Sequence, residues 1–260
     1  MTQTINLPLG LKNRRLEPDE WEKTIFAFQS PYRLKDLCIQ SEPLVEETLV
    51  SQEFKVRLAT TEDRRNSASL LIQKMYSWRG YDTNVLSHDP HKIVLVAYQE
   101  DQIAGTLSLG IDSPEGMVVD QLYKPEADQL RLEGRRPCDI TRLAVDQEIK
   151  SKSVLAALFH LSFIYGRNIH NATDFLIEVN PRHMIFYKRM LGFELYGQEK
   201  VCPRVNAPAV LLRLDLAHAD EQITRYGGMG ALATGVKTIY PYFFTREDEL
   251  GITQRLLKGE

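Results

Sequence analysis

The amino-acid sequence predicts a mixed α/β fold in which helices cover a central sheet. Residues 54–60, FKVRLAT, alternate apolar and polar side chains, as a half-buried strand does. Residues 152–168, KSVLAALFHLSFIYGRN, are apolar nearly all round, which is typical of a buried helix. Strand-type and helix-type segments alternate along the rest of the chain, and this order indicates a sheet of mixed direction.

The first half of the chain continues this alternation. Residues 60–78 predict a helix, because apolar residues recur at helical spacing and Thr60 or Thr61 can cap its start. The elements expected next are two strands within 91–111 joined by a turn at 100–102, a helical stretch at 118–134 interrupted by Pro125, and a strand at 137–149.

The segment 181–193, PRHMIFYKRMLGF, carries start and stop signals for a short helix. Asn180 is a suitable N-cap, Pro181 suits the first turn and Gly192 suits the end. Strands are expected on both sides of this helix, at 174–179, 194–201 and 207–216.

Three regions follow from this pattern. Residues 1–53 are expected to form an N-terminal extension that is partly disordered. Residues 1–20 are polar and interrupted by proline and are expected to be loose, and the weakly periodic residues 21–52 are expected to form a helical or irregular arm packed on the main domain. Residues 54–216 carry the alternating elements and form the main domain. Residues 217–260 form a C-terminal helical tail, in which a Gly-rich link precedes a last helix that Thr245 can cap.

Composition excludes several classes of function. The formal net charge of −3 gives no basic excess, so nucleic acid is not an expected partner. The three cysteines, Cys38, Cys138 and Cys202, have neither metal-ligand nor disulfide-framework spacing. The N-terminus lacks the apolar core of a signal peptide, and no apolar run approaches the roughly 20 residues that span a bilayer. We therefore expect a cytoplasmic protein without a transmembrane segment.

The placement of Asn180, Tyr187 and Gly192-Phe193 within this order of elements resembles the GNAT acyltransferase superfamily over residues 54–216. The resemblance implies a mostly antiparallel central sheet flanked by helices, with N- and C-terminal extensions. Four phrases look more specifically like the N-acyl amino acid synthase branch, which is related to acyl-homoserine lactone synthases: CDITRLAVD, VNPRHMIFYKRMLGF, APAVLLRLDL and TIYPYFF.

The resemblance also bears on the acyl donor. GNAT enzymes that use coenzyme A typically have a Gly-rich loop after the fourth strand, whose N–H groups cradle the pyrophosphate. Here that loop, 146–154, has no glycine, which favours an acyl carrier protein, since its pantetheine arm carries one phosphate and no adenosine. Lys150 and Lys152 can meet that phosphate or the acidic carrier surface, or they are simply solvated. The basic helix face with Arg182 and Lys188 suits an acidic carrier protein or is likewise solvated.

Asp139 is the first candidate for catalysis. An amine attacks a thioester only when it is unprotonated, so a nearby base is useful. Side chains three residues apart in a strand face opposite sides unless a bulge intervenes, and the GNAT fold has a bulge in this strand. The resemblance therefore implies that Asp139 faces the amine, as a base or as an ammonium anchor, with a water to bridge its short side chain. The alternative is an ion pair of Asp139 with Arg142 or Arg57.

Other candidates surround the expected reaction centre. Arg142 can hold the carboxylate of the amino acid through a bidentate fork, or equally a carboxylate of the protein. By resemblance, Tyr187 protonates the departing thiolate or orients the pantetheine; the alternative is a packed ring whose hydroxyl bonds to the backbone. Backbone N–H groups near Leu143 to Val145 are expected to meet the oxyanion. His183 can relay protons or contact substrate, or it is structural.

Two apolar surfaces are candidates for the substrate pockets. The helix that follows the first strand offers the amino acid side chain a set of large residues: Met75, Tyr76, Trp78 and Tyr81. The buried helix and the strand after it offer the acyl chain another set, for which core packing is the default: Leu158, Phe159, Leu161, Phe163 and Ile177.

Together these features predict an N-acyltransferase that moves a long-chain fatty acyl group from acyl carrier protein to the amine of an amino acid. The acyl-phosphopantetheine of the carrier protein is the donor substrate, and no bound cofactor is expected. One alternative is an acyl-homoserine lactone synthase that uses S-adenosylmethionine, against which Ser108 counts because that family typically has Arg there. The others are an acyltransferase linked to protein sorting and a non-catalytic module that binds the carrier protein. The amino acid, the chain length and the oligomeric state are left open.

Overall fold

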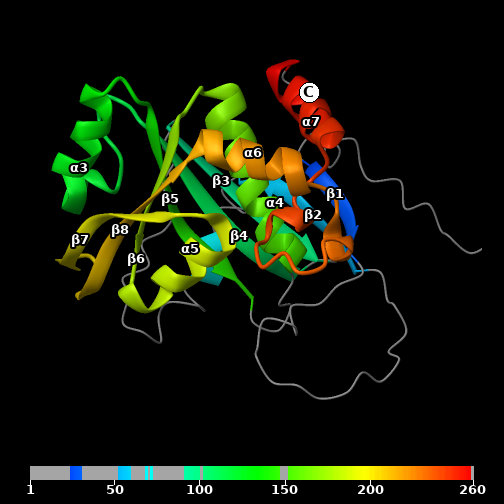
Figure 1. The fold of residues 1–260 in the computed structure, drawn as a ribbon, viewed down its shortest axis with the longest axis horizontal. Coiled ribbons are helices and arrows are strands. Elements are labelled where there is room, and N and C mark those ends of the chain that lie inside the picture. The colour runs from blue at the N-terminus through cyan, green and yellow to red at the C-terminus, as the bar shows by residue number, and fades with distance from the viewer. Residues whose placement is uncertain are drawn as a thin grey trace, which may run out of the picture.

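The computed structural model contains one sheet with eight strands in the order β1-β2-β3-β4-β5-β6-β8-β7 (Figure 1). It describes residues 24–30, 52–59, 68–69, 71–72, 91–99, 102–146 and 152–258. The strands are β1 Thr24–Ser30, β2 Gln52–Leu58, β3 Lys92–Gln99, β4 Gln102–Ile111, β5 Pro137–Val145, β6 Asp174–Val179, β7 Glu194–Cys202 and β8 Ala207–Asp215. All neighbouring strands are antiparallel except β5 and β6, which confirms the predicted mixed, mostly antiparallel sheet.

The parallel strands β5 and β6 are hydrogen-bonded over only a short length, and the candidate site lies where this pairing ends. Backbone pairing is confined to Pro137–Asp139 of β5 and Asp174–Leu176 of β6. Beyond these residues the two strands diverge, which leaves an opening in the sheet.

Strand β1 corrects one expectation about the N-terminal extension. A helical or irregular arm was expected at residues 21–52, and this is wrong for Thr24–Ser30, which pairs antiparallel with β2. The segment lacks a strong periodic pattern, and pairing along the edge of β2 is a long-range contact that local reasoning does not detect. The rest of the expectation for residues 1–53 falls almost entirely outside the described residues.

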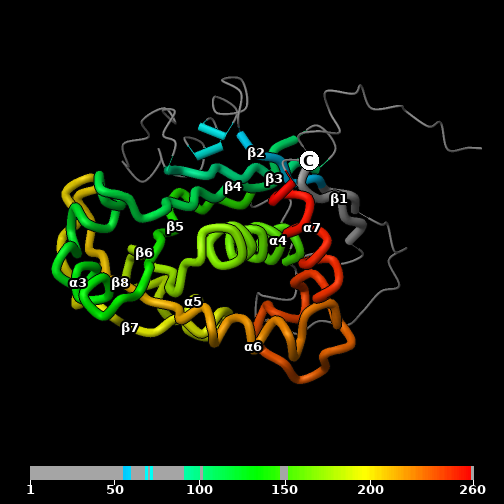
Figure 2. The backbone as a smooth tube through the Cα atoms, turned by 90° about the horizontal axis from the view of Figure 1, so that it is seen from above, coloured from blue at the N-terminus to red at the C-terminus, as the bar shows by residue number. Residues whose placement is uncertain are grey.

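One face of the sheet packs on α4 (Lys152–Phe163), which continues as a π-helical segment at Ile164–Ile169. Figure 2 shows α4 between the strands and the helices α5 (Met184–Leu191) and α6 (Leu216–Tyr226). We call this layer the main core. Its buried residues include Leu158, Phe159, Leu161 and Phe163, which pack inside the protein and do not line the pocket described below, whereas Ile177 of the same predicted set does.

The opposite face is covered by α3 (Asp120–Leu132) and by helical residues at 68–69 and 71–72. The α3 cluster consists of Met117, Val119, Tyr123, Ala127, Leu130, Leu176 and Leu211. Helix α3 departs from helical geometry at Tyr123, two residues before the Pro125 that was expected to interrupt it.

Three of the predicted helix caps are confirmed, whereas Thr60 and Thr61, predicted to cap an earlier helix, lie outside the described residues. The Asn180 side chain accepts a hydrogen bond of 3.2 Å from the backbone N–H of Arg182. Gly192 ends α5 in the left-handed region with φ of +82°. Thr245 Oγ1 accepts a hydrogen bond of 3.1 Å from the Asp248 N–H at the start of α7 (Arg246–Lys258).

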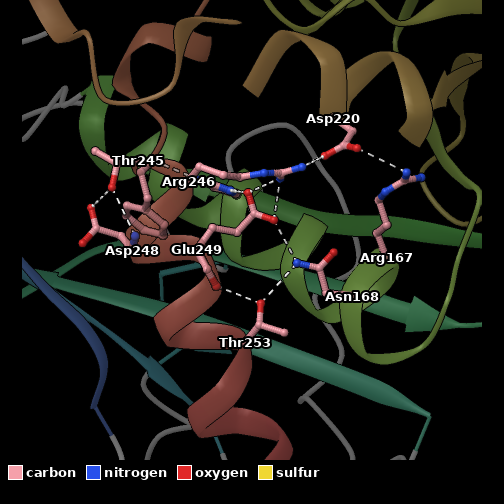
Figure 3. A network of polar contacts seen from close by, with 10 residues as sticks. Arg167, Asn168, Asp220, Thr245, Arg246, Asp248, Glu249 and Thr253 are labelled. Atoms are coloured by element: carbon pink, nitrogen blue, oxygen red, sulfur yellow. Dashed lines mark hydrogen bonds and ion pairs between the residues drawn. The ribbon is translucent and has the colours of Figure 1, made fainter. Parts of the chain in front are cut away.

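A polar network joins α7 to the π-helical segment after α4 (Figure 3), and His160 extends it to α4 itself. Glu249 Oε2 lies 3.2 Å from His160 Nε2, and Glu249 Oε1 accepts a hydrogen bond of 2.9 Å from Asn168. Arg246 Nη1 contacts both oxygens of Glu249, at 2.8 and 2.7 Å. Because His160 Nδ1 accepts a hydrogen bond from the Phe244 N–H, the neutral ring carries its proton on Nε2 and donates it to Glu249. The C-terminal region is thereby fixed to the main core.

Candidate active site

A pocket of about 710 Å³ lies where β5 and β6 diverge. Its lining comes from both sides of the sheet. Main-core residues on its wall include Leu143, Val179 and Tyr187, whereas Val119 belongs to the α3 cluster. The pocket therefore passes through the gap in the sheet, and two substrates can approach each other from opposite faces.

A bulge in β5 shapes one wall of this pocket. The register between β4 and β5 shifts between Thr106 and Ser108, and Arg142 has φ of +53°, in the left-handed region. The bulge expected in this strand is thus present. Residues Ile140 to Val145 all line the pocket, so the segment after the bulge borders the space that a substrate would enter.

Asp139 lies behind this wall and does not itself line the pocket. Its side chain is 0% exposed, and Oδ2 accepts a hydrogen bond of 3.1 Å from the Val119 N–H. Oδ1 has no hydrogen-bond partner among the residues that the structure describes. Burial raises the pKa of Asp139 to about 6, although the backbone of Val119 and the charge of Lys92 oppose the rise. The ion pairs with Arg142 or Arg57 considered above are not formed by Asp139 in the described structure.

Gly110 makes room for the Asp139 carboxylate. The two residues are partners across β4 and β5, and a Cβ at position 110 would lie 2.2 Å from Asp139 Oδ1. Gly110→Ala is therefore expected to displace Asp139 and to destabilise the protein by roughly 1–3 kcal/mol, measured by urea unfolding. Gly251→Ala in α7 is the matched control, since nothing lies within 4 Å of its Cβ. Equal stabilities of the two variants would contradict this close packing.

Arg142 lines the pocket and is half-buried, and burial lowers the pKa of its guanidinium. No carboxylate among the described residues forms an ion pair with it. Two partners were considered for Arg142, a carboxylate of the protein and a carboxylate of the substrate. The first is not observed in the described part of the chain, so the guanidinium can bind a substrate carboxylate.

Helix α5 brings Tyr187 to the pocket, and the 3₁₀ turn Pro181–His183 directly before α5 brings His183 there. The Tyr187 ring packs edge-on against Phe186 and Phe193, with ring centroids 5.2 and 5.9 Å apart. His183 is exposed, and its Nε2 accepts a hydrogen bond of 3.1 Å from Arg182 Nε.

The remaining candidates divide between the surface and the residues that are not described. Arg182 and Lys188 are exposed on or next to α5. Lys152 lies at the start of α4, with its Nζ 5.4 Å from the centroid of the Tyr242 ring, and it does not line the pocket. Trp78, Tyr81 and Lys150 lie outside the described residues, as do Met75 and Tyr76. Ile72, from the same predicted helix as Trp78, does line the pocket.

Three charged residues line the pocket without having been predicted from the sequence: Lys92, Glu178 and Arg204. Glu178 Oε2 accepts hydrogen bonds from Arg204 Nη2 and, at 3.8 Å, from Cys202 Sγ. Burial raises the pKa of Glu178, and the charge of Arg204 opposes that rise. The available sequence clue was an acidic residue directly after the apolar run FLI in the strand DFLIEV.

The family model for the N-acyl amino acid synthase FeeM matches residues 67–215 of this sequence, more than half of the chain. The protein belongs to the FeeM family of N-acyl amino acid synthases. It is accordingly an amide-forming acyltransferase, with an acyl donor and an amine acceptor as substrates. No curated protein sequence matches the chain.

Comparison with the solved structure of FeeM shows that this FeeM-family enzyme has a GNAT-like fold. The structure of FeeM from uncultured soil microbes is 24% identical over 65% of this chain and 93% of that chain, with a TM-score of 0.58. An acyl-CoA N-acyltransferase from Pseudomonas aeruginosa is 15% identical over 63% and 99% of the two chains, with a TM-score of 0.44. The acyl-homoserine lactone synthase LasI is 13% identical over 64% and 91%, with a TM-score of 0.45.

Two further properties of this enzyme concern its described residues only. None of the helices in the described ranges has the length and hydrophobicity needed to cross a membrane. The same residues contain no cluster of His, Cys, Asp and Glu side chains suited to hold a metal ion.

Proposed function

We propose that this FeeM-family enzyme transfers a long-chain fatty acyl group from acyl carrier protein to the α-amine of an amino acid. The observation that carries the proposal is the pocket through the β5–β6 gap, whose wall is apolar on the main-core side and charged on the side of α3. A thioester carrying an acyl chain suits the apolar side, and a zwitterionic amino acid suits the charged side. A carrier-protein donor also implies a cytoplasmic site of action.

Surface charge supports a carrier protein as the donor. Arg182 and Lys188 are exposed and are sequence neighbours of the pocket residues His183 and Tyr187, and Ile185, between them in sequence, is 67% exposed. A cationic surface with an apolar residue at its centre complements an acidic helical partner. The glycine-free segment 146–154, with Lys150 and Lys152, offers cations to a single phosphate and lacks the cradle that a diphosphate prefers.

The charges at the pocket suit a zwitterionic acceptor. Lys92, Arg142 and Arg204 are cationic lining residues, Glu178 is anionic, and Asp139 adds a second buried carboxylate behind the wall. Arg142 binds the carboxylate of the amino acid in this proposal, because it lacks an ion pair in the described part of the protein. Trp78 and Tyr81, which lie outside the described residues, are proposed to contact the side chain of the amino acid. His183, directly before α5, is proposed to contact the substrate.

The reaction forms one C–N bond and breaks one C–S bond. The unprotonated amine attacks the thioester carbonyl carbon, and backbone N–H groups between Leu143 and Val145 stabilise the oxyanion. The attacking nitrogen then loses a proton to Asp139 through a water. Tyr187 gives its phenol proton to the departing thiolate, and the free carrier-protein thiol leaves.

The proposal is tested by incubating the protein with palmitoyl acyl carrier protein and an equimolar mixture of the twenty amino acids. Mass spectrometry then detects new N-acyl amino acids, and palmitoyl coenzyme A replaces the carrier protein in a parallel reaction. A product formed preferentially from the carrier protein is expected. Preference for coenzyme A would contradict the donor assignment, and a product formed only after S-adenosylmethionine is added would favour the lactone-synthase alternative.

Tyr187→Phe is expected to lower kcat by roughly 100-fold without changing KM for the acyl donor, because the phenol proton acts only as the thiolate leaves. Tyr226→Phe in α6 is the matched control and should retain the wild-type kcat. A raised donor KM with an unchanged kcat would instead assign Tyr187 to positioning of the pantetheine.

A further inference from the structure

Glu178 is placed by the alternation of strand β6. Phe175 and Ile177 point into the main core, whereas Leu176 packs in the α3 cluster. Glu178 is the next residue on the α3 side, where Arg204 and Cys202 contact it. An acidic side chain is thus built into the acceptor side of the pocket by the period of the strand.

The two oxygens of Glu178 have different environments. Oε2 is held by Arg204, whereas Oε1 is buried and has no hydrogen-bond partner among the described side chains and backbone groups. The side chain as a whole is only 11% exposed. A buried carboxylate oxygen without a donor is unfavourable, and such groups in proteins usually meet a ligand or water. Because Glu178 also lines the pocket, a donor that enters there can supply the hydrogen bond that Oε1 lacks.

Glu178 is better placed than Asp139 to touch a substrate. Both carboxylates lie on the same side of the sheet, but Asp139 is enclosed by Gly110 and the Val119 amide, and only Glu178 lines the pocket. The negative charge of Glu178 contributes to the raised pKa of Asp139, so the two carboxylates repel each other. A cation that enters the pocket relieves this repulsion.

We infer that Glu178 binds the ammonium group of the acceptor amino acid through Oε1 and takes the proton that must leave before the amine can attack. The inference rests on the proposed function. The nitrogen loses two protons in that reaction, one before and one after it attacks the thioester, and Glu178 is the base for the first of these. The ammonium nitrogen transfers one proton to Glu178 and becomes the free amine. It forms the C–N bond, and its second proton passes to Asp139. Since Tyr187 supplies one proton to the thiolate, the cycle releases one net proton to solvent.

Arg204 acts in this scheme as a positioning residue. Its guanidinium donates to Glu178 Oε2, to the side chain of Gln121 at 2.8 Å and to the carbonyl of Val118 at 3.4 Å. These contacts join the β7–β8 turn to the start of α3 and occupy Oε2, so Oε1 is the oxygen of Glu178 that is left for a further donor.

The test compares Glu178→Gln with Glu221→Gln, a matched control on the exposed surface of α6. Palmitoyl acyl carrier protein is the donor, and the acceptors are the mixture of twenty amino acids or aminooxyacetate. Aminooxyacetate keeps a carboxylate for Arg142, but its amine is uncharged at neutral pH. Glu178→Gln is expected to slow amide formation with amino acids by roughly 100-fold, with an unchanged KM for the donor. Acylation of aminooxyacetate should continue near the wild-type rate, after subtraction of the enzyme-free reaction.

Glu178→Asp keeps the carboxylate and is expected to retain part of the activity with amino acids. Activity of Glu178→Gln equal to that of the Glu221→Gln control would overturn the inference while leaving the proposed function intact. If Glu178→Gln lost equal activity with both acceptors, or if it raised the KM for the donor and lowered the melting temperature, Glu178 would have only a structural role. A wild-type protein that acylates neither acceptor would remove the proposed function and the inference with it.

Discussion

Replacing Asp139 by asparagine is expected to raise the melting temperature of the protein at pH 7.5 and to slow amide formation. Burial raises the pKa of Asp139 from 3.8 to about 6, so ionising this carboxylate opposes folding. A shift of about two units corresponds to on the order of 3 kcal/mol, at 1.36 kcal/mol per unit. Asparagine has nearly the same shape and can still accept the hydrogen bond from Val119, but it carries no charge.

The sign of the pH dependence follows from linkage. A carboxyl whose pKa is raised in the folded state contributes stability that is complete below pH 3.8 and is lost as the pH rises through about 6. The stability difference between Asp139→Asn and wild type should therefore be largest at pH 7.5 and vanish near pH 4, measured by thermal unfolding across this range. A difference that does not vary with pH would contradict a buried, ionised Asp139.

The activity of Asp139→Asn should decrease, although its stability increases. If Asp139 takes the second proton of the attacking nitrogen, Asp139→Asn slows turnover by roughly 100-fold at pH 7.5. Wild-type turnover should also fall as the pH drops below about 6, where Asp139 becomes protonated. Full activity of a stabilised Asp139→Asn enzyme would limit this residue to the packing of the wall.

Glu249→Gln is expected to lower the free energy of unfolding by about 3 kcal/mol at pH 7, because it weakens a buried charge network. Burial alone would raise the pKa of Glu249, but hydrogen bonds from His160, Asn168 and Arg246 outweigh it and hold the pKa at about 2. The resulting stability is present above pH 4.5 and is lost as the pH falls toward 2. Urea unfolding at pH 7 and at pH 3 measures both parts of this prediction.

Glu247→Gln is the matched control, since Glu247 is exposed on the same helix. It should change the free energy of unfolding by less than about 0.5 kcal/mol, as surface substitutions usually do. Comparable losses for both variants would attribute the effect to the helix dipole, because both acids lie in the first turn of α7.

Features with a local cause were determined by the sequence by itself. The caps at Asn180, Gly192 and Thr245 depend on a few neighbouring residues, and the structure confirms each of them. The buried character of 152–168 follows from the absence of a polar face, and α4 indeed lies inside the main core. The GNAT-like order of elements was predictable for the same reason, because the hydrophobic periodicity of a strand or a helix can be recognised within a short stretch of sequence.

Only the tertiary structure decided how distant residues meet. It made β1 a strand through pairing with β2, enclosed Asp139 behind Gly110, and brought Glu178 to Arg204 at the pocket. His160 and Glu249 are 89 positions apart, and neither has a local pattern that names the other. Such contacts depend on where strands diverge and which side of a strand each residue occupies. Those properties are fixed by packing across the whole sheet, so no short stretch of sequence contains them.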